Sequence, residues 1–600
     1  MKRKAACGVL AFLLATVMSA PSLSLATTYN WVGGSTGYWH VNTNWSPTGV
    51  PNSGDTALVT AAGSIVNLNG WYANMVGNLT IASEHEVQTT ITSPNYDTSF
   101  TFAVPSGSAS LTNNGIFRLA DTGKNSWIYP GSSLSISGTG RIIMESSAKS
   151  RIYIDSPKSI TNGANHTIEG VGNVDPFAMS NYGMIQATGN RLMMARGFNN
   201  YTGGVLRSNP GAVLQLGIWY NDSSGLNFGY DGRGGVIDLN GGTVKAELAD
   251  FTNADIRNSG SGGSLNIPIR TSGSSSTLYG NTKLGSSVVL NINAPSANYN
   301  GNSLSFSADL QTGTPPVLTN DGVINVQGGG NPPSTYYYST CGAASGTLLT
   351  GSGRLVLNGN PNSQFTVGFG SAGLTQDVNH TIEGGGMLMG KIVNNGTILA
   401  NNSNLNVAGN ISGTGQVKVQ DGGRLVVGPP GEGSFTLQNK DLLMSSSGAI
   451  TVGWNSTVNL SGDFSYAMTD PSKWTWDSST LKMSGSAPDW HFLEVGGRTD
   501  LPDPFVNNFA LSNLVISGDI ALVDLYHNTA VPGREALYVN YLTVSPGATL
   551  NLNNLQLFCY LDNIMHQVRA GEGALFGGGQ IINRPLKPVT TPILLLLLGD

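Results

Sequence analysis

The sequence predicts an all-β protein, a right-handed parallel β-helix (β-solenoid), from its composition, a long internal repeat and a series of short alternating segments. Charged residues make up 11% of the 600 residues, and 80 are glycine. Few charges leave few of the side-chain pairs that stabilise helices, and glycine is costly inside a helix but suits turns. Apolar residues make up 40%, so the chain can form a core.

The repeat is a motif that occurs twice without change. Asn165-His166-Thr167-Ile168-Glu169-Gly170 returns as Asn379-His380-Thr381-Ile382-Glu383-Gly384, and 379 − 165 = 214. The flanking segments that begin at residues 137 and 181 return at residues 350 and 394, and both offsets are 213. A register kept over about 50 residues indicates repeat architecture.

Short segments with strict apolar–polar alternation predict strands that bury one face only. They lie at residues 133–137, 151–154, 213–216, 288–292 and 417–419. No segment of helical length and period separates them, which disfavours alternating β/α units. One coil of such strands cannot bury its face alone, so coils stack on one another.

Four steps before predicted strands are expected to be turns, because asparagine, aspartate and glycine tolerate left-handed backbone. These steps are Asn114-Gly115, Asn162-Gly163, Asp321-Gly322 and Asn395-Gly396. An array of β-sandwiches would also use such turns. The long offset with its internal sub-repeats favours the solenoid.

The N-terminus has the pattern of a secretory signal: Lys2 to Lys4 are basic, Ala5 to Met18 are apolar, and Ala26 ends a cleavage site. A membrane anchor is the alternative, for which the apolar segment is short. We therefore expect a signal peptide at residues 1–26 and no transmembrane segment in the mature chain. The other expected parts are a Trp-rich cap with first coils at 27–110, a solenoid at 111–463 with related blocks at about 111–210 and 318–427, a C-terminal β module at 464–585 and a short tail at 586–600, which could be a degenerate sorting signal.

Trp31, Trp39 and Trp45 lie among glycine and proline turns near the start of the mature chain. Rings of this size can cover the exposed end of a sheet, which otherwise invites edge pairing. The alternative interpretation of the three rings is a sugar-binding platform. A second group of tryptophans, Trp474, Trp476 and Trp490, marks a change of composition after Phe464.

The motif contains the only duplicated titratable pairs, His166 with Glu169 and His380 with Glu383. A histidine with a carboxylate could do acid–base chemistry. Positions i and i+3 of a strand face opposite ways, however, so the pair should not meet and the motif is interpreted as a structural turn.

The acidic residues elsewhere in the sequence are scattered. Asp500 and Asp503, with Arg498, form the nearest group and are expected to be solvated. A glycosidase needs two carboxylates at a fixed separation, and no such pair stands out.

Asp231, Asp238 and Asn240-Gly241-Gly242 suggest a calcium turn, but their spacing departs from the nonapeptide pattern, so a plain glycine-rich turn is preferred. Cys341 and Cys559, 218 residues apart, could form a disulfide, although the fold must stand without one. The sequence therefore predicts no catalytic, cofactor-binding or metal-binding residues.

The opening Trp/Gly/Asn-Trp-Ser-Pro segment, the duplicated unit and the segment from Glu535 to Asn553 resemble large exported bacterial β-repeat proteins. These include autotransporter-passenger-like (adhesin-like) proteins and proteins with a PEP-CTERM sorting tail or a dockerin. Thr591-Pro592-Ile593 and the five leucines after it are similar to a shortened sorting tail, without its Pro-Glu-Pro motif. The resemblance implies a β-helix outside the cell.

We expect a secreted, non-enzymatic scaffold of the cell surface or extracellular matrix, which contacts polysaccharide or other envelope components. A net charge of −6 without a basic block disfavours nucleic-acid binding. Two other functions remain open: a polysaccharide lyase or glycoside hydrolase on a β-helix, and a self-assembling sheath subunit. The sequence does not determine the oligomeric state.

Overall fold

The computed structural model describes most of the chain between residues 26 and 586. The described ranges are 26–61, 63–90, 96–194, 197–217, 231–247, 249–267, 275–293, 302–309, 312–329, 338–359, 361–368, 370–485, 490–529 and 535–586. The expected signal peptide, apart from its last residue, and the tail from residue 587 onward lie outside them.

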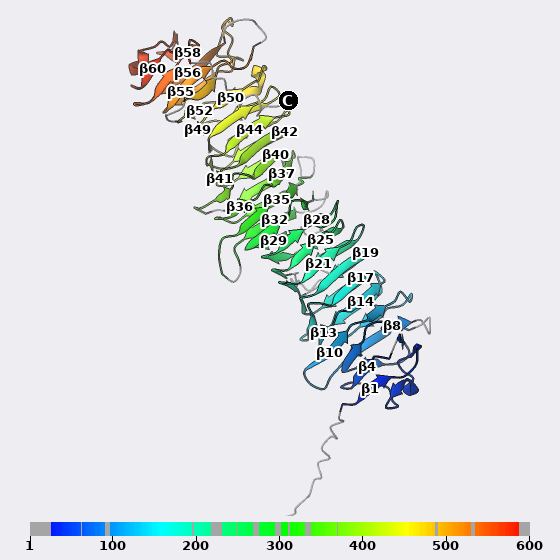
Figure 1. The fold of residues 1–600 in the computed structure, drawn as a ribbon. Helices are drawn as coiled ribbons and strands as arrows, with labels where there is room; N and C mark the ends of the chain where they lie inside the picture. The colour runs from blue at the N-terminus through cyan, green and yellow to red at the C-terminus, as the bar shows by residue number, and fades with distance from the viewer. Residues whose placement is uncertain are drawn as a thin grey trace, which may run out of the picture.

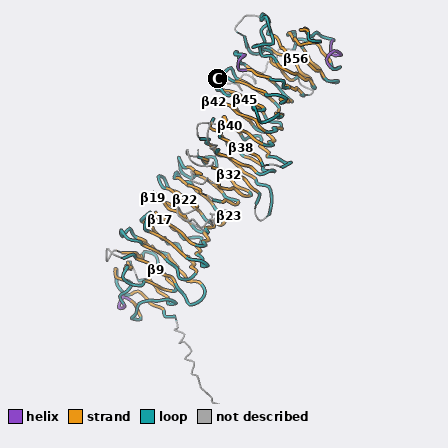
Figure 2. The backbone as a smooth tube through the Cα atoms, turned by 180° about the vertical axis from the view of Figure 1, so that it is seen from behind, coloured by secondary structure: helices purple, strands orange, loops and turns teal. Residues whose placement is uncertain are grey.

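The described chain is all-β, as predicted. Its strands stack along one long axis, from β1 near one end to β60 at the other (Figure 1). Figure 2 shows the same stack from behind, with the loops along its edges. The helices of the described chain are three short 3-10 turns, η1 (Asn42–Asn44), η2 (Pro471–Lys473) and η3 (Glu572–Phe576). Within the described residues, no helix has the length and apolar character to cross a membrane.

Three series of strands run the length of the stack, because over most of it each strand pairs in parallel with the third strand after it. Series A contains β1 (Thr28–Trp31), β4 (Thr56–Val59), β7 (Asn78–Ile81), β10 (Ser108–Asn113), β13 (Ser133–Ser137), β16 (Ile160–Asn162), β18 (Met179–Asn181), β20 (Phe198–Tyr201), β23 (Asp231–Arg233), β26 (Asp250–Thr252), β29 (Ser275–Tyr279), β32 (Asn302–Ser307), β35 (Ser339–Ala343), β38 (Ser363–Val367), β45 (Arg424–Val427), β48 (Ala449–Val452) and β51 (Trp474–Trp476).

Series B contains β2 (Thr36–Tyr38), β5 (Ile65–Asn69), β8 (Glu86–Thr90), β11 (Ile116–Leu119), β14 (Arg141–Glu145), β21 (Val205–Ser208), β24 (Val236–Asp238), β27 (Asp255–Arg257), β30 (Asn281–Leu284), β33 (Val317–Asn320), β36 (Leu348–Thr350), β39 (Leu374–Gln376), β41 (Ile392–Asn394), β43 (Ile411–Ser412), β46 (Thr436–Asn439), β49 (Thr457–Leu460), β52 (Thr480–Met483) and β54 (Leu511–Ile516).

Series C contains β6 (Asn74–Val76), β9 (Thr98–Phe102), β12 (Ser126–Ile128), β15 (Ser150–Ile154), β22 (Val213–Gly217), β25 (Thr243–Glu247), β28 (Ser264–Ile267), β31 (Val289–Ile292), β34 (Val323–Val326), β37 (Arg354–Asn358), β44 (Gln416–Gln420), β47 (Asp441–Met444), β50 (Phe464–Tyr466), β53 (His491–Glu494), β55 (Asp519–Val523), β57 (Thr549–Asn551) and β60 (Gln580–Ile582). All five alternating segments of the sequence fall on strands, namely β13, β15, β22, β31 and β44.

Four long strands bend from one series into the next. β17 (Thr167–Pro176) and β19 (Met184–Met194) run from series B into series C. β40 (Thr381–Met389) and β42 (Thr397–Ala408) run from series C into series A. The two copies of the duplicated motif open β17 and β40, so they occupy the same kind of corner, but the second copy lies one series further round.

Antiparallel pairs close the stack at its two ends. β1 pairs with β3 (Trp45–Ser46) at the N-terminal end. Near the C-terminal end β56 (Ala536–Val544) pairs with β58 (Gln556–Leu561), which pairs with the antiparallel β59 (Ile564–Gln567). An end strand would otherwise offer its backbone groups to another chain.

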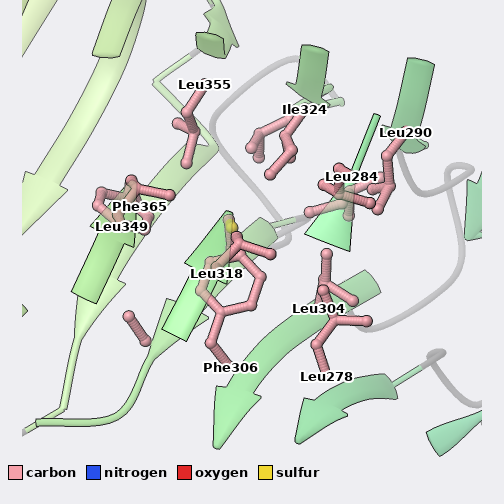
Figure 3. Packing of buried hydrophobic residues seen from close by; sticks show 14 of the residues in the cluster. Leu278, Leu284, Leu290, Leu304, Phe306, Leu318, Ile324, Leu349, Leu355 and Phe365 are labelled. Atoms are coloured by element: carbon pink, nitrogen blue, oxygen red, sulfur yellow. The ribbon is translucent and has the colours of Figure 1, made fainter. Parts of the chain in front are cut away.

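The core is a set of apolar rows, one for each series, that meet along the axis. Leu290, Ile324 and Leu355 of series C occupy successive positions of one row. Figure 3 shows this row facing leucines and phenylalanines of the other two series, such as Leu318 and Phe306. Successive side chains of a strand point to opposite faces, so alternate residues face the core and are buried while those between them point outward. This is the alternation seen in the sequence.

Glycine is required at the bends of the long strands. Gly170 has φ +121°, and a Cβ there would lie 1.9 Å from the carbonyl oxygen of Met144. Its counterpart Gly384 has φ +105° and the same approach, 1.9 Å, to the carbonyl oxygen of Leu357. A side chain at either position would meet both backbone strain and a backbone clash.

Three of the four predicted Asn-Gly and Asp-Gly steps lie between consecutive strands, as expected for turns, and in the fourth Asn162 is the last residue of β16. The reason for glycine is different from the expected one. None of these eight residues is among the described residues with positive φ. A Cβ at Gly115 would lie 2.3 Å from the carbonyl oxygen of His85, and one at Gly396 would lie 2.3 Å from that of His380. Glycine is needed there because the neighbouring backbone approaches closely.

We predict that Gly170→Ala lowers the melting temperature much more than Gly211→Ala. Both glycines have positive φ, but nothing lies within 4 Å of a Cβ at Gly211. The control should cost about 1–2 kcal/mol for the left-handed backbone, and Gly170→Ala should cost several kcal/mol more for the displaced strand. Thermal unfolding followed by circular dichroism measures both, and equal shifts would contradict the role given to the bend.

Candidate functional site

The duplicated histidine is buried and hydrogen-bonded at the first corner. The Nδ1 of His166 lies 2.8 Å from the Oδ1 of Asn162, and its Nε2 lies 3.1 Å from the Nδ2 of Asn113. The Oδ1 of Asn113 accepts from the N–H of Gly115, so its Nδ2 is the donor to the ring. The ring is therefore neutral, with its proton on Nδ1. Burial lowers the pKa of His166 to about 4.

The second copy keeps most of this arrangement. The Nε2 of His380 lies 3.0 Å from the Nδ2 of Asn320, and burial again lowers the pKa of the histidine to about 4. Gln376 stands where the first copy has Asn162, and its Nε2 donates to the carbonyl oxygen of His380 at 2.7 Å. The Nδ1 of His380 and the Oε1 of Gln376 are both buried without a partner. With glutamine at this corner two polar atoms thus stay unpaired, whereas Asn162 pairs with the histidine in the first copy.

Buried asparagines continue the network along series A. The Nδ2 of Asn162 donates to the Oδ1 of Asn181, and the Nδ2 of Asn181 donates to the Oδ1 of Asn200, both at 2.8 Å. Each asparagine is stacked in register on the one before it. Such a ladder satisfies polar groups that could not otherwise be buried at a turn.

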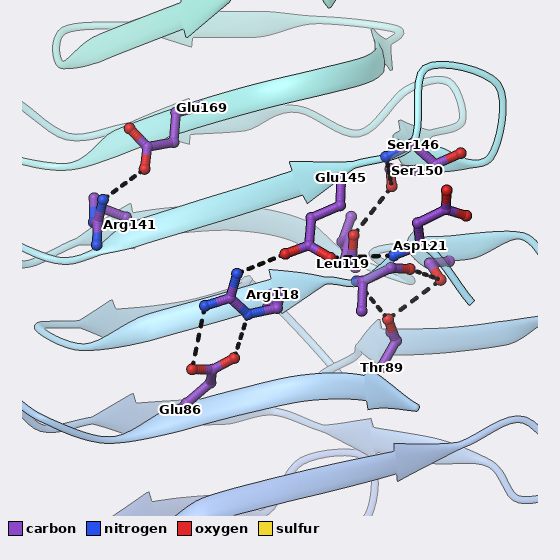
Figure 4. Close-up of polar contacts among 12 residues, drawn as sticks. Glu86, Thr89, Arg118, Leu119, Asp121, Arg141, Glu145, Ser146, Ser150 and Glu169 are labelled. Carbon is purple, nitrogen blue, oxygen red and sulfur yellow. Dashed lines mark hydrogen bonds and ion pairs between the residues drawn. The ribbon is translucent and has the colours of Figure 1, made fainter. Parts of the chain in front are cut away.

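The duplicated glutamates have partners of their own. The Oε1 of Glu169 pairs with the Nη1 of Arg141, and the Oε1 of Glu383 pairs with the Nη1 of Arg354, each at 2.7 Å. Figure 4 shows Arg141 and Glu169 on neighbouring strands. Since the histidine and the glutamate of each copy have separate partners, the motif is built as a structural corner, in agreement with the strand geometry.

The local sequence pattern alone does not predict these arginine–glutamate ion pairs. Arg141 and Arg354 belong to the matched flanks, and their distances from the glutamates along the chain are 169 − 141 = 28 and 383 − 354 = 29. That separation equals the length of one three-strand repeat. The nearly constant offset between arginine and glutamate is therefore the sequence signal that predicts these ion pairs. A similar network joins Arg118 to Glu86 and Glu145 (Figure 4).

The three tryptophans of the N-terminal segment cover the core, as the preferred interpretation predicts. Trp31, Trp39 and Trp45 are all almost fully buried. Trp45 packs edge-on against Trp31 at 5.1 Å and against Trp39 at 4.8 Å between ring centroids. Their rings are therefore unavailable as a sugar-binding platform. Trp474 and Trp476 are likewise buried, beside Phe464.

A different set of rings lies at the same end of the stack, and all of them except the half-buried His40 are exposed. We call Tyr38, His40, Trp71, Tyr72 and Tyr96 the aromatic cluster. The ring of His40 stacks on Tyr72 at 3.9 Å and lies 5.5 Å from Tyr38, and Trp71 lies 4.6 Å from Tyr96. The peptide bond between Trp71 and Tyr72 joins the two groups. Trp71 is 60% exposed and Tyr72 51%.

The carboxylate of Asp238, one of the acidic residues noted in the sequence, already has hydrogen-bond donors and an ion-pair partner. The Oδ1 of Asp238 accepts from the backbone N–H groups of Asn240 and Ser259, and its Oδ2 pairs with Arg207 at 3.1 Å. Asn240 and Gly241 have positive φ, so this is a glycine-containing turn. For Asp231 the structure describes only the backbone, in β23.

The group in the proline-rich loop is exposed. Asp500 pairs with Arg498 at 2.7 Å, and the Oδ1 of Asp503 accepts from the N–H of Phe505. Cys341 and Cys559 are both free and buried, and burial raises the pKa of both thiols.

Among the described residues, no group of three or more His, Cys, Asp or Glu side chains is placed to hold a metal ion. Comparison of the chain with protein-family models, curated proteins and solved structures finds no match. The inference of function therefore depends on the chain itself.

We predict that the two buried histidines make the fold sensitive to acid. The unfolded chain takes up protons on both imidazoles as the pH falls below about 6.5, and the folded chain does so only near pH 4. The contribution of the two neutral histidines to the free energy of unfolding is thus fully present above pH 6.5. It decreases toward pH 4, by about 3 kcal/mol for each histidine.

The change of melting temperature between pH 7 and pH 4.5 tests this. It should be smaller in His166→Gln/His380→Gln than in the wild type, because glutamine does not titrate. His527→Gln is the control, since His527 is exposed. A double variant with the wild-type pH dependence would contradict the prediction.

Proposed function

We propose that this protein is a secreted, non-enzymatic right-handed β-solenoid, a scaffold of the cell surface or extracellular matrix that binds neutral polysaccharide through its aromatic cluster. The three parallel series support a solenoid, in which one strand of each series makes one coil. The right-handed sense is supported by the strong preference of parallel crossover connections for that hand. Export is supported by the signal-like N-terminus and by the resemblance to exported bacterial β-repeat proteins.

The aromatic cluster is the observation that carries the binding proposal. Large rings exposed together on a surface mark a binding site more often than single ones do. Tyrosine and tryptophan present an apolar face with a polar edge, and they lose little rotamer freedom on binding. The apolar faces of sugar rings are suitable partners for such surfaces.

The charge around the cluster indicates which polysaccharide would bind. Between Thr27 and Phe117 the sequence contains no lysine and no arginine. The segments that carry the cluster therefore offer an acidic polysaccharide no cation of their own, and burial of an unpaired carboxylate is costly. An uncharged polysaccharide meets rings and neutral polar groups, such as Asn67 and Thr36, which are joined by a hydrogen bond of 3.1 Å.

We predict that Trp71→Ala/Tyr72→Ala abolishes binding to neutral polysaccharides on a glycan array or in affinity electrophoresis. Loss of a stacking contact with an aromatic side chain costs about 1–3 kcal/mol for each ring, which is enough to remove weak binding. Trp454→Ala is the matched control, because Trp454 is 69% exposed far along the chain, between β48 and β49.

The control should bind like the wild type. Binding by neither the wild type nor the control would overturn the polysaccharide proposal. Concentration-dependent light scattering that disappears in the double variant would instead assign the cluster to contacts between copies of the chain.

A further inference from the structure

Four buried oxygen atoms near the C-terminal end of the stack have no hydrogen-bond partner. They are the Oε2 of Glu494, the Oε2 of Glu535, the Oδ1 of Asn528 and the hydroxyl oxygen of Tyr466. Glu494 is 0% exposed and Glu535 3%. Unpaired buried polar atoms are costly, and four in one place need an explanation.

The other polar atoms of these residues are fully used, and they hold the side chains in place. The Oε1 of Glu494 accepts from the backbone N–H groups of Leu525 and Tyr526 at 2.8 and 2.9 Å. The Oε1 of Glu535 accepts from the N–H of Thr529 at 2.7 Å. The Nδ2 of Asn528 donates to the carbonyl oxygens of Tyr466 and Met468. Glu494, Glu535 and Asn528 are therefore each held by hydrogen bonds through one side-chain atom and leave a single oxygen unpaired.

The four residues come together through the segment after β53. A Cβ at Gly496 would lie 3.0 Å from the hydroxyl oxygen of Tyr466 and 3.1 Å from the Cβ of Asn528. The next residue, Gly497, forms an antiparallel bridge with Ala536, which places Glu535 beside the same segment. Glu494 lies two residues before Gly496. The unpaired oxygens thus belong to side chains that surround one short stretch of backbone.

The charge of this group is not balanced. Within the described residues, neither Glu494 nor Glu535 forms an ion pair. Burial raises the pKa of Glu494 to about 9 and also raises that of Glu535, and Asp524 adds a like charge to both. Two buried carboxylates without a cation must either take up protons or bind a cation.

We propose that Glu494, Glu535, Asn528 and Tyr466 form a calcium site. All four unpaired atoms are oxygens, the donor type that a hard cation requires. Two carboxylates match the charge of a divalent ion. Calcium accepts six to eight oxygens in flexible geometry, so waters can complete a set of four, whereas magnesium demands a near-ideal octahedron.

A pair of protonated carboxyl groups is the competing explanation. In that case each new O–H needs an acceptor, and the Tyr466 hydroxyl adds a third donor. The hydroxyl reaches no acceptor at hydrogen-bonding distance. A central ion would give each of the four unpaired oxygens a partner at once, which direct hydrogen bonds among them do not.

The test uses the full mature chain, dialysed against a chelator at pH 8, and compares wild type with Glu494→Gln/Glu535→Gln. Addition of about 5 mM CaCl2 should raise the melting temperature of the wild type by about 2 °C or more, and magnesium should raise it less. Terbium should bind the same site and emit when tryptophan is excited, because Trp474 lies 4.7 Å from Tyr466 between ring centroids.

The double variant should lose both the calcium shift and the terbium emission. Its metal-free form should melt no lower than metal-free wild type, since glutamine leaves no ionisable group buried at these two positions. Asp500→Asn/Asp503→Asn, which changes exposed carboxylates of the same region, should keep both signals. Absence of a calcium shift in the wild type, or an equal shift in Glu494→Gln/Glu535→Gln, would overturn the site. Polysaccharide binding by the aromatic cluster is independent of either result.

Discussion

Parallel pairing between a strand and the third strand after it is the constraint on which the rest of the structure depends. Each strand buries alternate side chains against the axis and supports the strands before and after it, as Leu290, Ile324 and Leu355 do. The core is therefore narrow and continuous, and no single repeat could form it alone. The chain must also turn three times in each repeat without burying unpaired backbone groups.

The corners meet that requirement in two ways. Glycines such as Gly170 and Gly384 allow one long strand to bend where other repeats use two strands. Inside the bends, neutral histidine and asparagine side chains satisfy the polar groups, as His166 and Asn162 do. Charged pairs such as Arg141 with Glu169 join a half-exposed arginine to a largely buried glutamate on neighbouring strands.

The two ends of the stack differ in chemistry. At the N-terminal end, buried tryptophans close the core, and a second set of rings remains exposed in a region without basic residues. Near the C-terminal end, the polar group around Glu494 and Glu535 is buried, and among the described residues no cation pairs with it. In the function and the cation site that we propose, the two ends would separate contact with polysaccharide from cation-dependent stability.

The amino-acid pattern is enough to predict the all-β class, the strands at the alternating segments, the burial of Trp31, Trp39 and Trp45 over the core, and the separation of His166 from Glu169. These follow from side-chain period and residue type, which are local properties. The place of the second motif copy, one series further round, is visible only in the folded chain, because any corner of three similar series can accept the same bend. The fold also leaves Trp71 exposed while Trp39 is buried, and it brings Glu494 and Glu535, 535 − 494 = 41 residues apart, to the same backbone segment at Gly496-Gly497. Such contacts depend on which strands stack, and that information is not contained in any single stretch of sequence.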